Sequence, residues 1–557
     1  MKKTMKSIAL LLSVVLLFGS MATSALACTS MAAGKDATTD GSVLISHTCD
    51  GWYDNRIQIV PGATYEEGAM VDIYRDPCYD TNPGYEPKLV GQIPQVEKTN
   101  TYFNIGYPFM NDKQVMMGEH TWSGRVDVRG DSGLFVIANL QMLALQRADT
   151  AREACEIMGA LALEYGYADG GEAVFVGDEN EAWIFEICGP GPLWTPESGL
   201  PGAHWVARRV PDDSVHVGAN RSRTGVVDFE DTENFIVSKD ITKMPIEMGW
   251  YKEGEEFNFS EIFHPVSPTS SAYICSRREW RAFDLIAPSL ELPVLPKEAA
   301  YPFTVKPDEK ISAQTIMNII YRDHYEGTPY SMTEGPDSGA FGNPVRFGVK
   351  SDQKTEDMVG YHWERSIATS VCSYSFVSQS RSWLPDEIGG VLWFGQDSPD
   401  TTVYVPLYCG ITEVPRSWSE VTRDHFDKDT AWWAFNFVNN WAQLRWNAMY
   451  EVISEEKAKL EGTFFDNQDA FEASVAKLYE TDKEAAIEKL TQYSNNAMMT
   501  VEAAWWKLAG YLVGGFYDGR AKNDDGKYIT LGYTTEYLEE VGYGAGQSAE
   551  HKEFLSK

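Results

Sequence analysis

The sequence has few basic residues for its length. Its 557 residues include 81 aspartates and glutamates but only 47 lysines and arginines, and the formal net charge is −34 at pH 7. A surface this acidic repels phosphate backbones and anionic lipid headgroups. We therefore expect no nucleic-acid partner and no binding to an anionic membrane surface.

Several common catalytic and metal-binding motifs are also missing. The sequence contains no H-E-x-x-H, no G-x-S-x-G, no Walker loop and no complete G-x-G-x-x-G. None of its eight cysteines forms a C-x-x-C pair, which argues against zinc and thioredoxin-like chemistry. We therefore expect neither a metal nor an organic cofactor.

Long apolar runs are absent except near the N-terminus, where the run is too short to span a bilayer. Three lysines within the first six residues precede an apolar stretch at residues 8–18, and small residues then lead to Ala-Leu-Ala at 25–27. This pattern is typical of a secretory signal peptide over residues 1–27. We expect signal peptidase to remove it, leaving an exported protein that is secreted, periplasmic or in the cell envelope. A signal anchor is the alternative.

Cleavage at this place would make Cys28 the first residue of the mature protein. A cysteine attacks as its thiolate and needs a base, and an α-amino group has an ordinary pKa of about 7.7–8.0, close to working pH. An N-terminal cysteine therefore carries nucleophile and base together. Two other interpretations stay open: lipid attachment, although Ala25 stands where a lipoprotein site usually has leucine, and coincidence.

Export also permits disulfides among the other cysteines. Seven cysteines remain besides Cys28, so at least one of them stays free or pairs outside the chain. A bridge between Cys49 and Cys78 is the pairing we expect. The alternative, that most of these cysteines are buried apolar thiols, is left open.

Hydrophobic periodicity predicts an α+β fold with mainly antiparallel strands. A capping box at Thr150 and Glu153 opens a helix that ends at Gly166. After about residue 415 the pattern becomes helical, so we expect a catalytic domain over 28–415 and a C-terminal helical extension over 416–557 packed on it. Predicted strands lie at 29–33, 42–47, 173–176 and 182–187, and predicted helices at 430–453, 468–479 and 484–512.

Short motifs occur in order along residues 28–455. They are Cys28-Thr29-Ser30, Gly34-Lys35, Asp40-Gly41-Ser42, Asp50, Asn111-Asp112, Glu181-Ala182-Trp183, Gly218-Ala219-Asn220, Gly327-Thr328-Pro329 and Arg381-Ser382-Trp383-Leu384-Pro385. In these motifs the sequence resembles the C69 family of dipeptidases, N-terminal-nucleophile (Ntn) hydrolases distantly similar to bile-salt (choloylglycine) hydrolases and penicillin V acylases. The resemblance implies an αββα four-layer sandwich, two packed antiparallel sheets with helices outside.

The resemblance also implies roles for individual residues. Cys28 would attack the scissile carbonyl, and Asp50 would orient its α-amino group. Asn111 falls on the family's Asn-Glu dipeptide, with Asp112 in place of the glutamate, and Asn220 falls on a second asparagine of the wider superfamily. Either side-chain amide would donate to the oxyanion.

Two further residues are implied by the bile-salt hydrolase branch. Arg277 resembles an active-site arginine there, and His47 stands where those relatives carry an arginine, a position we assign to substrate binding.

The predicted function is an exported cysteine-type dipeptidase that cleaves short peptides through a thioester on Cys28. Three alternatives stay open. One is a linear-amide acylase of the bile-salt hydrolase or penicillin acylase type, another a lipid-anchored binding protein without enzymatic activity, and the third a surface structural protein that uses its aromatic helices for contacts.

Overall fold

A computed structural model gives the fold of most of the chain. It describes residues 28–79, 85–122, 124–130, 132–265, 271–294, 301–346, 354, 364–523, 525–543, 553–554 and 556–557. The predicted signal peptide at residues 1–27 lies outside the described residues.

The first sheet includes strand β1, which begins directly after the predicted nucleophile Cys28. All of its neighbouring strands are antiparallel, and β1 lies between β12 and β2. Within the described residues this sheet has seven strands, in the order β14 (Thr304–Val305), β12 (Val215–Gly218), β1 (Thr29–Ala33), β2 (Leu44–Asp50), β15 (Cys372–Gln379), β16 (Val391–Gln396) and β17 (Val405–Tyr408).

A second antiparallel sheet packs against the first. Strands β1 and β2 of the first sheet contact β8 and β9 of the second, and all residues of β1, β2 and β9 are buried. Its described strands number eight, in the order β13 (Phe235–Val237), β11 (His204–Val210), β10 (Ala182–Cys188), β9 (Gly171–Gly177), β8 (Met116–Trp122), β7 (Met110–Asn111), β6 (Tyr102–Asn104) and β3 (Gln58–Val60).

A glycine permits the close approach of the two sheets beside the predicted site. A Cβ atom on Gly118 in β8 would lie 3.0 Å from the Cβ of His47 and 3.0 Å from the carbonyl oxygen of Ser46, both in β2. Such contacts are tighter than ordinary van der Waals packing, so only glycine lets β8 lie this near to β2 without displacement.

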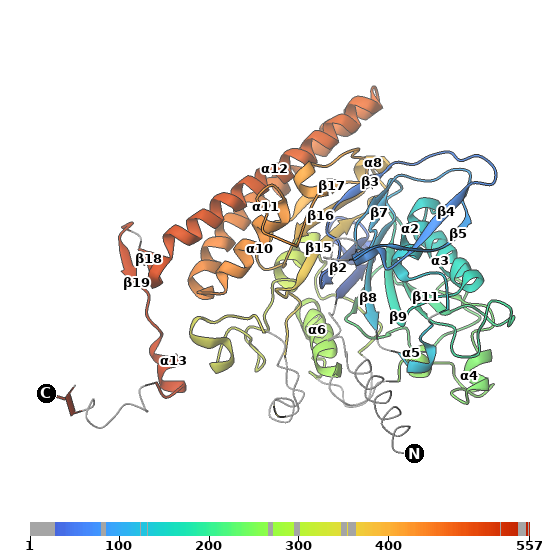
Figure 1. The fold of residues 1–557 in the computed structure, drawn as a ribbon, viewed down its shortest axis with the longest axis horizontal. Helices are drawn as coiled ribbons and strands as arrows, with labels where there is room; N and C mark the ends of the chain where they lie inside the picture. Colours follow the sequence, from blue (N-terminus) through green and yellow to red (C-terminus); the bar gives the residue numbers. More distant parts are fainter. Residues whose placement is uncertain are drawn as a thin grey trace, which may run out of the picture.

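Helices lie against both sheets (Figure 1). Helices α2 (Ile137–Arg147) and α3 (Ala151–Tyr165) contact strands of the second sheet, with α3 on β9, β10 and β11. On the first sheet, α6 (Ser271–Ile286) contacts β12, while α10 (Ala431–Ala442), α11 (Trp446–Tyr479) and α12 (Lys483–Gly515) contact β16 or β17. The predicted mixed α and β class with antiparallel sheets is confirmed.

The remaining elements are short. Strands β4 (Met70–Arg75) and β5 (Lys88–Pro94) form a separate hairpin, as do β18 (Arg520–Lys522) and β19 (Tyr528–Thr530). The short helices are α4 (Lys243–Glu247), α5 (Phe259–Phe263), α8 (Asp386–Gly389), α9 (Arg416–Ser419) and α13 (Thr535–Glu540).

Buried ion pairs fasten the C-terminal helices to the rest of the molecule. Glu472 in α11 accepts from both terminal nitrogens of Arg381, at 2.6 and 2.9 Å. Glu461, about three turns earlier on the same helix, pairs with Arg322 at 2.7 Å. Because each carboxylate is buried with its partner, removing either partner would leave an uncompensated charge in the interior.

The expected bridge between Cys49 and Cys78 is wrong. In the part of the chain that the structure describes, all eight cysteines are free and buried. Buried apolar thiols were the open alternative, and their burial raises the pKa of both Cys49 and Cys78 well above the usual range.

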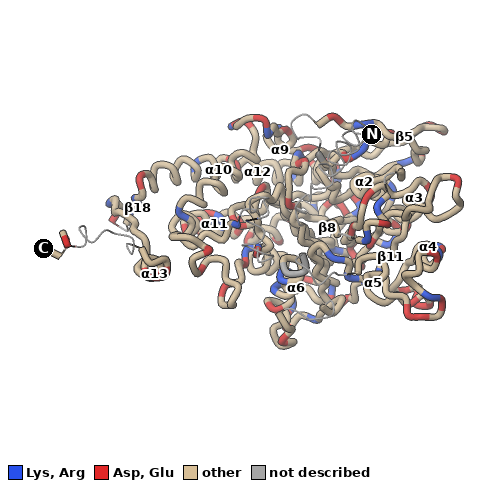
Figure 2. Tube along the Cα trace, turned by 60° about the horizontal axis from the view of Figure 1, so that its bottom comes forward, with Lys and Arg blue, Asp and Glu red and all other residues tan. Residues whose placement is uncertain are grey.

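The surface charge matches the composition. Acidic residues are spread along the whole trace rather than gathered on one element (Figure 2). Among the helices that the structure describes, none combines the length and apolar character needed to cross a membrane.

Candidate active site

Cys28 lies directly before strand β1, where the two sheets meet. Its carbonyl oxygen accepts a hydrogen bond of 2.9 Å from Arg278, and the next residue, Thr29, donates its N–H to the hydroxyl of Thr48 at 3.0 Å. The pairing of Thr29 with Thr48 places Cys28 beside Cys49 on strand β2. The Cys28 side chain is 3% exposed in the full-length chain, so its position is fixed by packing as well as by these bonds.

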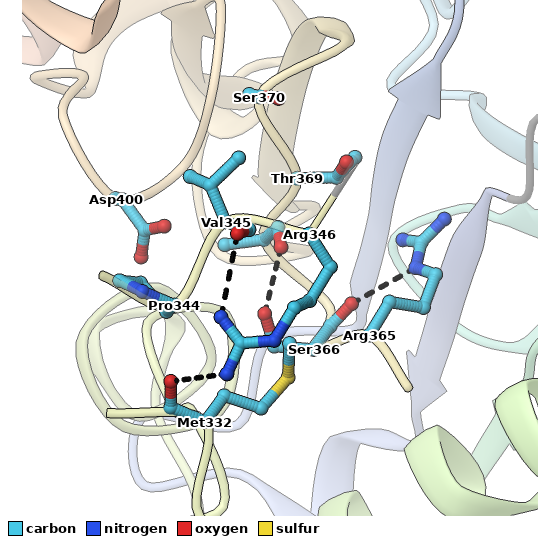
Figure 3. A pocket seen from close by; sticks show the side chains of 10 residues that line it. Met332, Pro344, Val345, Arg346, Arg365, Ser366, Thr369, Ser370 and Asp400 are labelled. Atoms are coloured by element: carbon cyan, nitrogen blue, oxygen red, sulfur yellow. Dashed lines mark hydrogen bonds between the residues drawn. The ribbon is translucent and has the colours of Figure 1, made fainter. Parts of the chain in front are cut away.

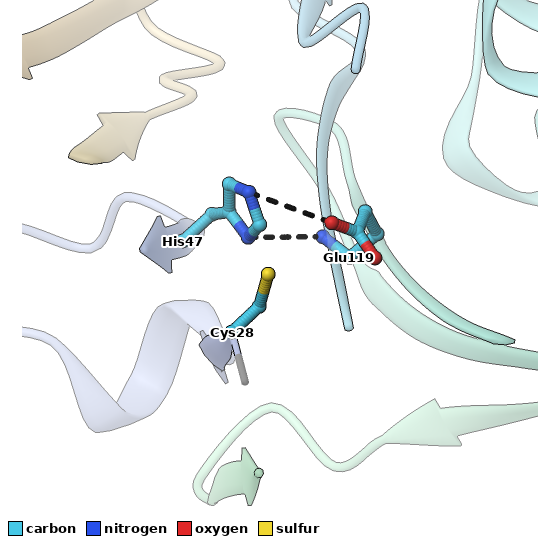
Figure 4. A group of neighbouring side chains, drawn as sticks. All are labelled: Cys28, His47 and Glu119. Atoms are coloured by element: carbon cyan, nitrogen blue, oxygen red, sulfur yellow. Dashed lines mark hydrogen bonds and ion pairs between the residues drawn. The ribbon is translucent and has the colours of Figure 1, made fainter. Parts of the chain in front are cut away.

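Three buried side chains converge at this point (Figure 4). Cys28 Sγ, a ring nitrogen of His47 and a carboxylate oxygen of Glu119 all lie within 4.8 Å of one another. His47 Nε2 is 3.7 Å from Glu119 Oε1, and the Glu119 backbone N–H donates to His47 Nδ1 at 3.4 Å. The hydroxyl of Ser30 lies 3.2 Å from the same Nδ1. Strands β2 and β8 contribute His47 and Glu119, and Cys28 lies directly before strand β1.

Burial sets the charge of the two titratable partners of Cys28. It lowers the pKa of His47 to about 3, and it raises the pKa of Glu119 well above its usual range, with the nearby Cys28 adding to the rise. At neutral pH His47 is therefore uncharged, and burial favours the protonated form of Glu119. Glu172, also buried, lies on the adjacent strand β9, and its pKa is likewise raised by burial and by Glu119.

Asp50 ends strand β2, one residue beyond the one that lies beside Cys28. Its Oδ2 accepts from Arg365 at 2.7 Å, and both side chains are buried. Burial raises the pKa of Asp50, while the charges of Arg365 and Arg278 oppose that rise. The second oxygen, Oδ1, is buried and has no well-aligned donor among the described residues, and the nearby Cys372 thiol, a weak donor, contributes to lowering the pKa of Asp50.

Asn220 reaches Cys28 through an arginine. The Asn220 Nδ2 donates to the carbonyl of Thr121 at 2.6 Å, and its Oδ1 accepts from Arg278 Nη2 at 2.9 Å. Arg278 also donates to the Cys28 carbonyl and, at 2.8 Å, to the hydroxyl of Thr29. Asn220 follows β12 with a φ of +59°, a left-handed conformation that asparagine tolerates better than most residues.

Arg277, the predicted active-site arginine, contacts Glu364 and Tyr330. Its Nε donates to Glu364 at 3.0 Å, and its guanidinium carbon lies 3.3 Å from the centre of the Tyr330 ring. Consecutive helical residues point about 100° apart, so on α6 only one of the two adjacent arginines can reach the start of β1. That residue is Arg278, not Arg277.

Asn111 is also occupied by other contacts. Its amide group donates to the carbonyls of Leu145 and Ala148, both at 2.9 Å, and its oxygen accepts from the backbone N–H groups of Lys113 and Val115. Both amide hydrogens are therefore committed to backbone carbonyls, and none remains for an oxyanion. Asn111 holds the β7–β8 turn against helix α2.

Sequence reasoning missed Glu119, Arg278 and Arg365. A glutamate within the apolar Met-Met-Gly-Glu stretch of β8 was a usable signal, because a carboxylate at a core position needs a partner or a function.

Arg365 also lines a small pocket together with Arg346, Ser366 and Asp400 (Figure 3). In that pocket Arg346 donates to the carbonyls of Met332, Asn343 and Val345.

Comparison with known proteins identifies the family. The model of peptidase family C69 matches residues 27–459, which is most of the chain. The chain belongs to peptidase family C69. It is therefore a hydrolase that acts on peptide bonds.

Curated relatives of this C69 peptidase are named as dipeptidases. A probable dipeptidase of Latilactobacillus sakei is 25% identical over 425 residues, which cover 73% of this chain and 79% of the relative. A probable dipeptidase B of Streptococcus pyogenes serotype M1 is 25% identical over 482 residues, covering 84% and 89%. Dipeptidase A of Lactobacillus helveticus is 24% identical over 412 residues, covering 72% and 79%.

Proposed function

We propose that this C69 peptidase is an exported dipeptidase whose nucleophile is the N-terminal Cys28 of the mature chain. The names of its relatives support a dipeptide substrate. The signal-peptide pattern before Cys28 supports export and supplies the cleavage that would free the α-amino group. The two facing sheets, with helices against both, support the four-layer αββα architecture of Ntn hydrolases as the setting of this site.

The observation that carries the proposal is the free oxygen of Asp50. A buried carboxylate oxygen without a donor costs about 1–3 kcal/mol, so a donor placed beside it by cleavage would stabilise the site. The α-amino group of a trimmed Cys28, one residue along the strand pair, is the donor that we propose for this oxygen. Arg365 holds the other Asp50 oxygen, which leaves Oδ1 as the acceptor for the amine.

The reaction then proceeds in two balanced steps. The Cys28 sulfur attacks the scissile carbonyl while its own amine takes the thiol proton, and the resulting ammonium returns a proton to the leaving amine as the C–N bond breaks. A thioester remains on Cys28. Water, deprotonated by the same amine, attacks the thioester and releases the carboxylic acid, and the thiol is restored.

Asn220 is the candidate donor to the tetrahedral oxyanion. One of its amide hydrogens is donated to Thr121, and Arg278 fixes the amide by bonding to its oxygen. The second hydrogen is left for the substrate, an interaction of a kind worth about 3–4 kcal/mol to the transition state. Because Arg278 bonds to both Cys28 and Asn220, it is a positioning residue in this scheme.

The test is the Cys28→Ala variant assayed on a panel of dipeptides beside acylated amino acids and bile-salt amides. We expect kcat/KM for dipeptides to fall by several orders of magnitude, as for loss of other catalytic nucleophiles. Cys155→Ser is the matched control, since Cys155 is a buried thiol in helix α3. Unchanged hydrolysis by Cys28→Ala, or exported material whose mass includes residues before Cys28, would contradict the proposal.

A further inference from the structure

The Cys28–His47–Glu119 cluster leaves more polar atoms unpaired than the proposed hydrolysis uses. Among the described residues, His47 Nε2 and both carboxylate oxygens of Glu119 make no well-aligned hydrogen bond, although all three atoms are buried and Glu119 lies beside Cys28 and Glu172. The two side chains are at most 1% exposed, so solvent does not replace the missing partners. Three such atoms around one thiol point to a ligand that accepts electron pairs.

We infer that this cluster is a binding site for a single Zn²⁺ ion, which blocks the enzyme reversibly. The donor set of thiolate, imidazole nitrogen and carboxylate oxygen is one that zinc prefers. In a tetrahedral zinc site with bonds of about 2.0–2.3 Å, ligand atoms lie roughly 3.4–3.8 Å apart. The His47 and Glu119 atoms already stand at 3.7 Å, and all three ligand atoms lie within 4.8 Å, so closure needs a side-chain movement of about 1 Å.

The second ring nitrogen of His47 is already supported. A zinc-binding imidazole needs a lone pair on one nitrogen and usually donates the proton on the other to a neighbouring oxygen. Ser30 Oγ lies 3.2 Å from Nδ1 and donates its own hydrogen to the Glu119 carbonyl at 2.7 Å, so it has a lone pair free to accept. In the tautomer that binds zinc, Nδ1 donates to Ser30 Oγ instead of accepting from the Glu119 N–H at 3.4 Å, and the lone pair then lies on Nε2.

The fourth ligand rests on the proposed function. If Cys28 is the first residue of the mature chain, its amine and thiolate bind the same ion as a five-membered chelate. The thiol, the ammonium and any protonated Glu119 carboxyl then each release one proton to solvent as zinc binds, and no electron transfer is involved. Zinc thereby occupies both the proposed nucleophile and its base.

The experiment measures Zn²⁺ binding to the exported, purified protein by competition with a chromogenic chelator, and Co²⁺ binding by absorption. We expect one ion per chain and a sulfur-to-cobalt charge-transfer band that disappears in Cys28→Ala. Glu119→Gln and His47→Gln should each weaken zinc binding by at least about tenfold. His204→Gln is the matched control, because His204 is equally buried but bonds to the Pro190 carbonyl away from the cluster.

The outcomes separate this inference from the proposed function. A protein that hydrolyses dipeptides but binds no zinc, or whose Cys28→Ala variant binds zinc as tightly as before, overturns the inference alone. Zinc binding without hydrolysis of any dipeptide overturns the proposed function alone. If the Glu119 and His47 variants fail to fold, the cobalt spectrum of the unaltered protein decides: a spectrum without a thiolate band refutes the site.

A second preparation tests the fourth ligand. A chain that retains one extra residue ahead of Cys28 keeps the thiol, His47 and Glu119 but loses the free amine. We expect it to bind zinc more weakly than the trimmed protein by at least about tenfold. Equal affinity of the two preparations would remove the amine from the ligand set.

Discussion

The buried pair of Asp50 and Arg365 offers the sharpest test of how the site works. Their side chains meet at 2.7 Å, and neither is exposed by more than 6%. Asp50→Asn keeps the shape of the side chain but removes its charge. The substitution therefore changes two things: the pairing of Arg365, and the acceptor proposed for the α-ammonium of Cys28.

The two effects can be separated, because a second substitution can restore the lost stability but cannot restore the carboxylate proposed for the amine. Breaking a buried ion pair on one side destabilises a protein by about 3–5 kcal/mol, because the other charge stays buried and unpaired. Replacing both partners by uncharged side chains is often close to neutral. The double variant Asp50→Asn/Arg365→Met should therefore recover most of the lost stability, whereas the amine would remain without its carboxylate.

We expect activity to depend on the contact between the Cys28 amine and Asp50 and not on the free energy of unfolding. A positioned general base contributes about 10²–10⁴-fold to rate, so both the single and the double variant should lose at least about 100-fold in kcat/KM. Urea unfolding followed by tryptophan fluorescence gives the stabilities, and dipeptide hydrolysis gives the rates. Arg381→Met/Glu472→Gln is the matched control, because it removes a second buried pair far along the sheet from Cys28.

A double variant that regains both stability and hydrolysis would refute the reasoning. Asp50 would then serve only to neutralise Arg365, and the α-ammonium would have to find another acceptor. A single variant that loses activity without losing stability would instead refute the energetic part, since the pair would contribute nothing to folding.

Two further predictions concern packing and pH. Gly118→Ala should lower the free energy of unfolding by about 1–3 kcal/mol and should also lower kcat/KM. The new Cβ would lie 3.0 Å from the Cβ of His47 and would displace the imidazole from its position in the site. A variant with the stability and activity of the wild type would contradict this. Burial alone would lower the pKa of His324, but Asp400 at 2.9 Å and Glu326 at 3.0 Å raise it to about 10. Protonated His324 therefore adds its full contribution to the free energy of unfolding below the ordinary histidine pKa of about 6.5. This contribution falls by about 1.4 kcal/mol per pH unit as the pH rises toward 10. Urea unfolding of the wild type and of His324→Gln across this range should converge, and parallel curves would argue against it.

The parts of the fold that depend on local signals were predictable from the sequence. The strand predicted at 29–33 is β1, and helix α3 starts at the Thr150 cap and ends at Gly166 with a φ of +82°, as its capping box and glycine indicate. Such signals lie within a few residues of the feature they determine. For the same reason the pairing of β1 with β2, two strands joined by a short turn, follows from the sequence.

The C-terminal helices show where periodicity fails. The predicted helix at 430–453 is two helices, because Arg445 leaves the helical conformation with φ −160° and ψ 65° and donates to the Leu531 carbonyl. Helix α11 then runs without interruption through residues 454–467, for which no helix was predicted. Its buried Glu461 weakens the apolar stripe, and only the distant partner Arg322 explains a carboxylate at that position.

The candidate site likewise contains residues that local sequence signals identify and residues that only the tertiary structure brings in. Cys28, His47 and Asp50 are close in sequence, and one strand pair brings them together. Glu119 and Arg365 join them only through tertiary packing. The resemblance pointed to Arg277, whereas the adjacent Arg278 on α6 bonds to the Cys28 carbonyl, and the sequence does not indicate which face of this helix meets β1.

A chain terminus is an unusual place for a precisely positioned group, because the first residues of a domain ordinarily fray. Here the start of β1 is held from three sides: Arg278 binds the Cys28 carbonyl, Thr48 accepts the Thr29 N–H, and β12 and β2 flank the strand. Both partners of each of these contacts remain in the chain after cleavage before Cys28. In the proposed mature protein we therefore expect these contacts to hold the sulfur in place while the amine is free, which is what a nucleophile that carries its own base requires.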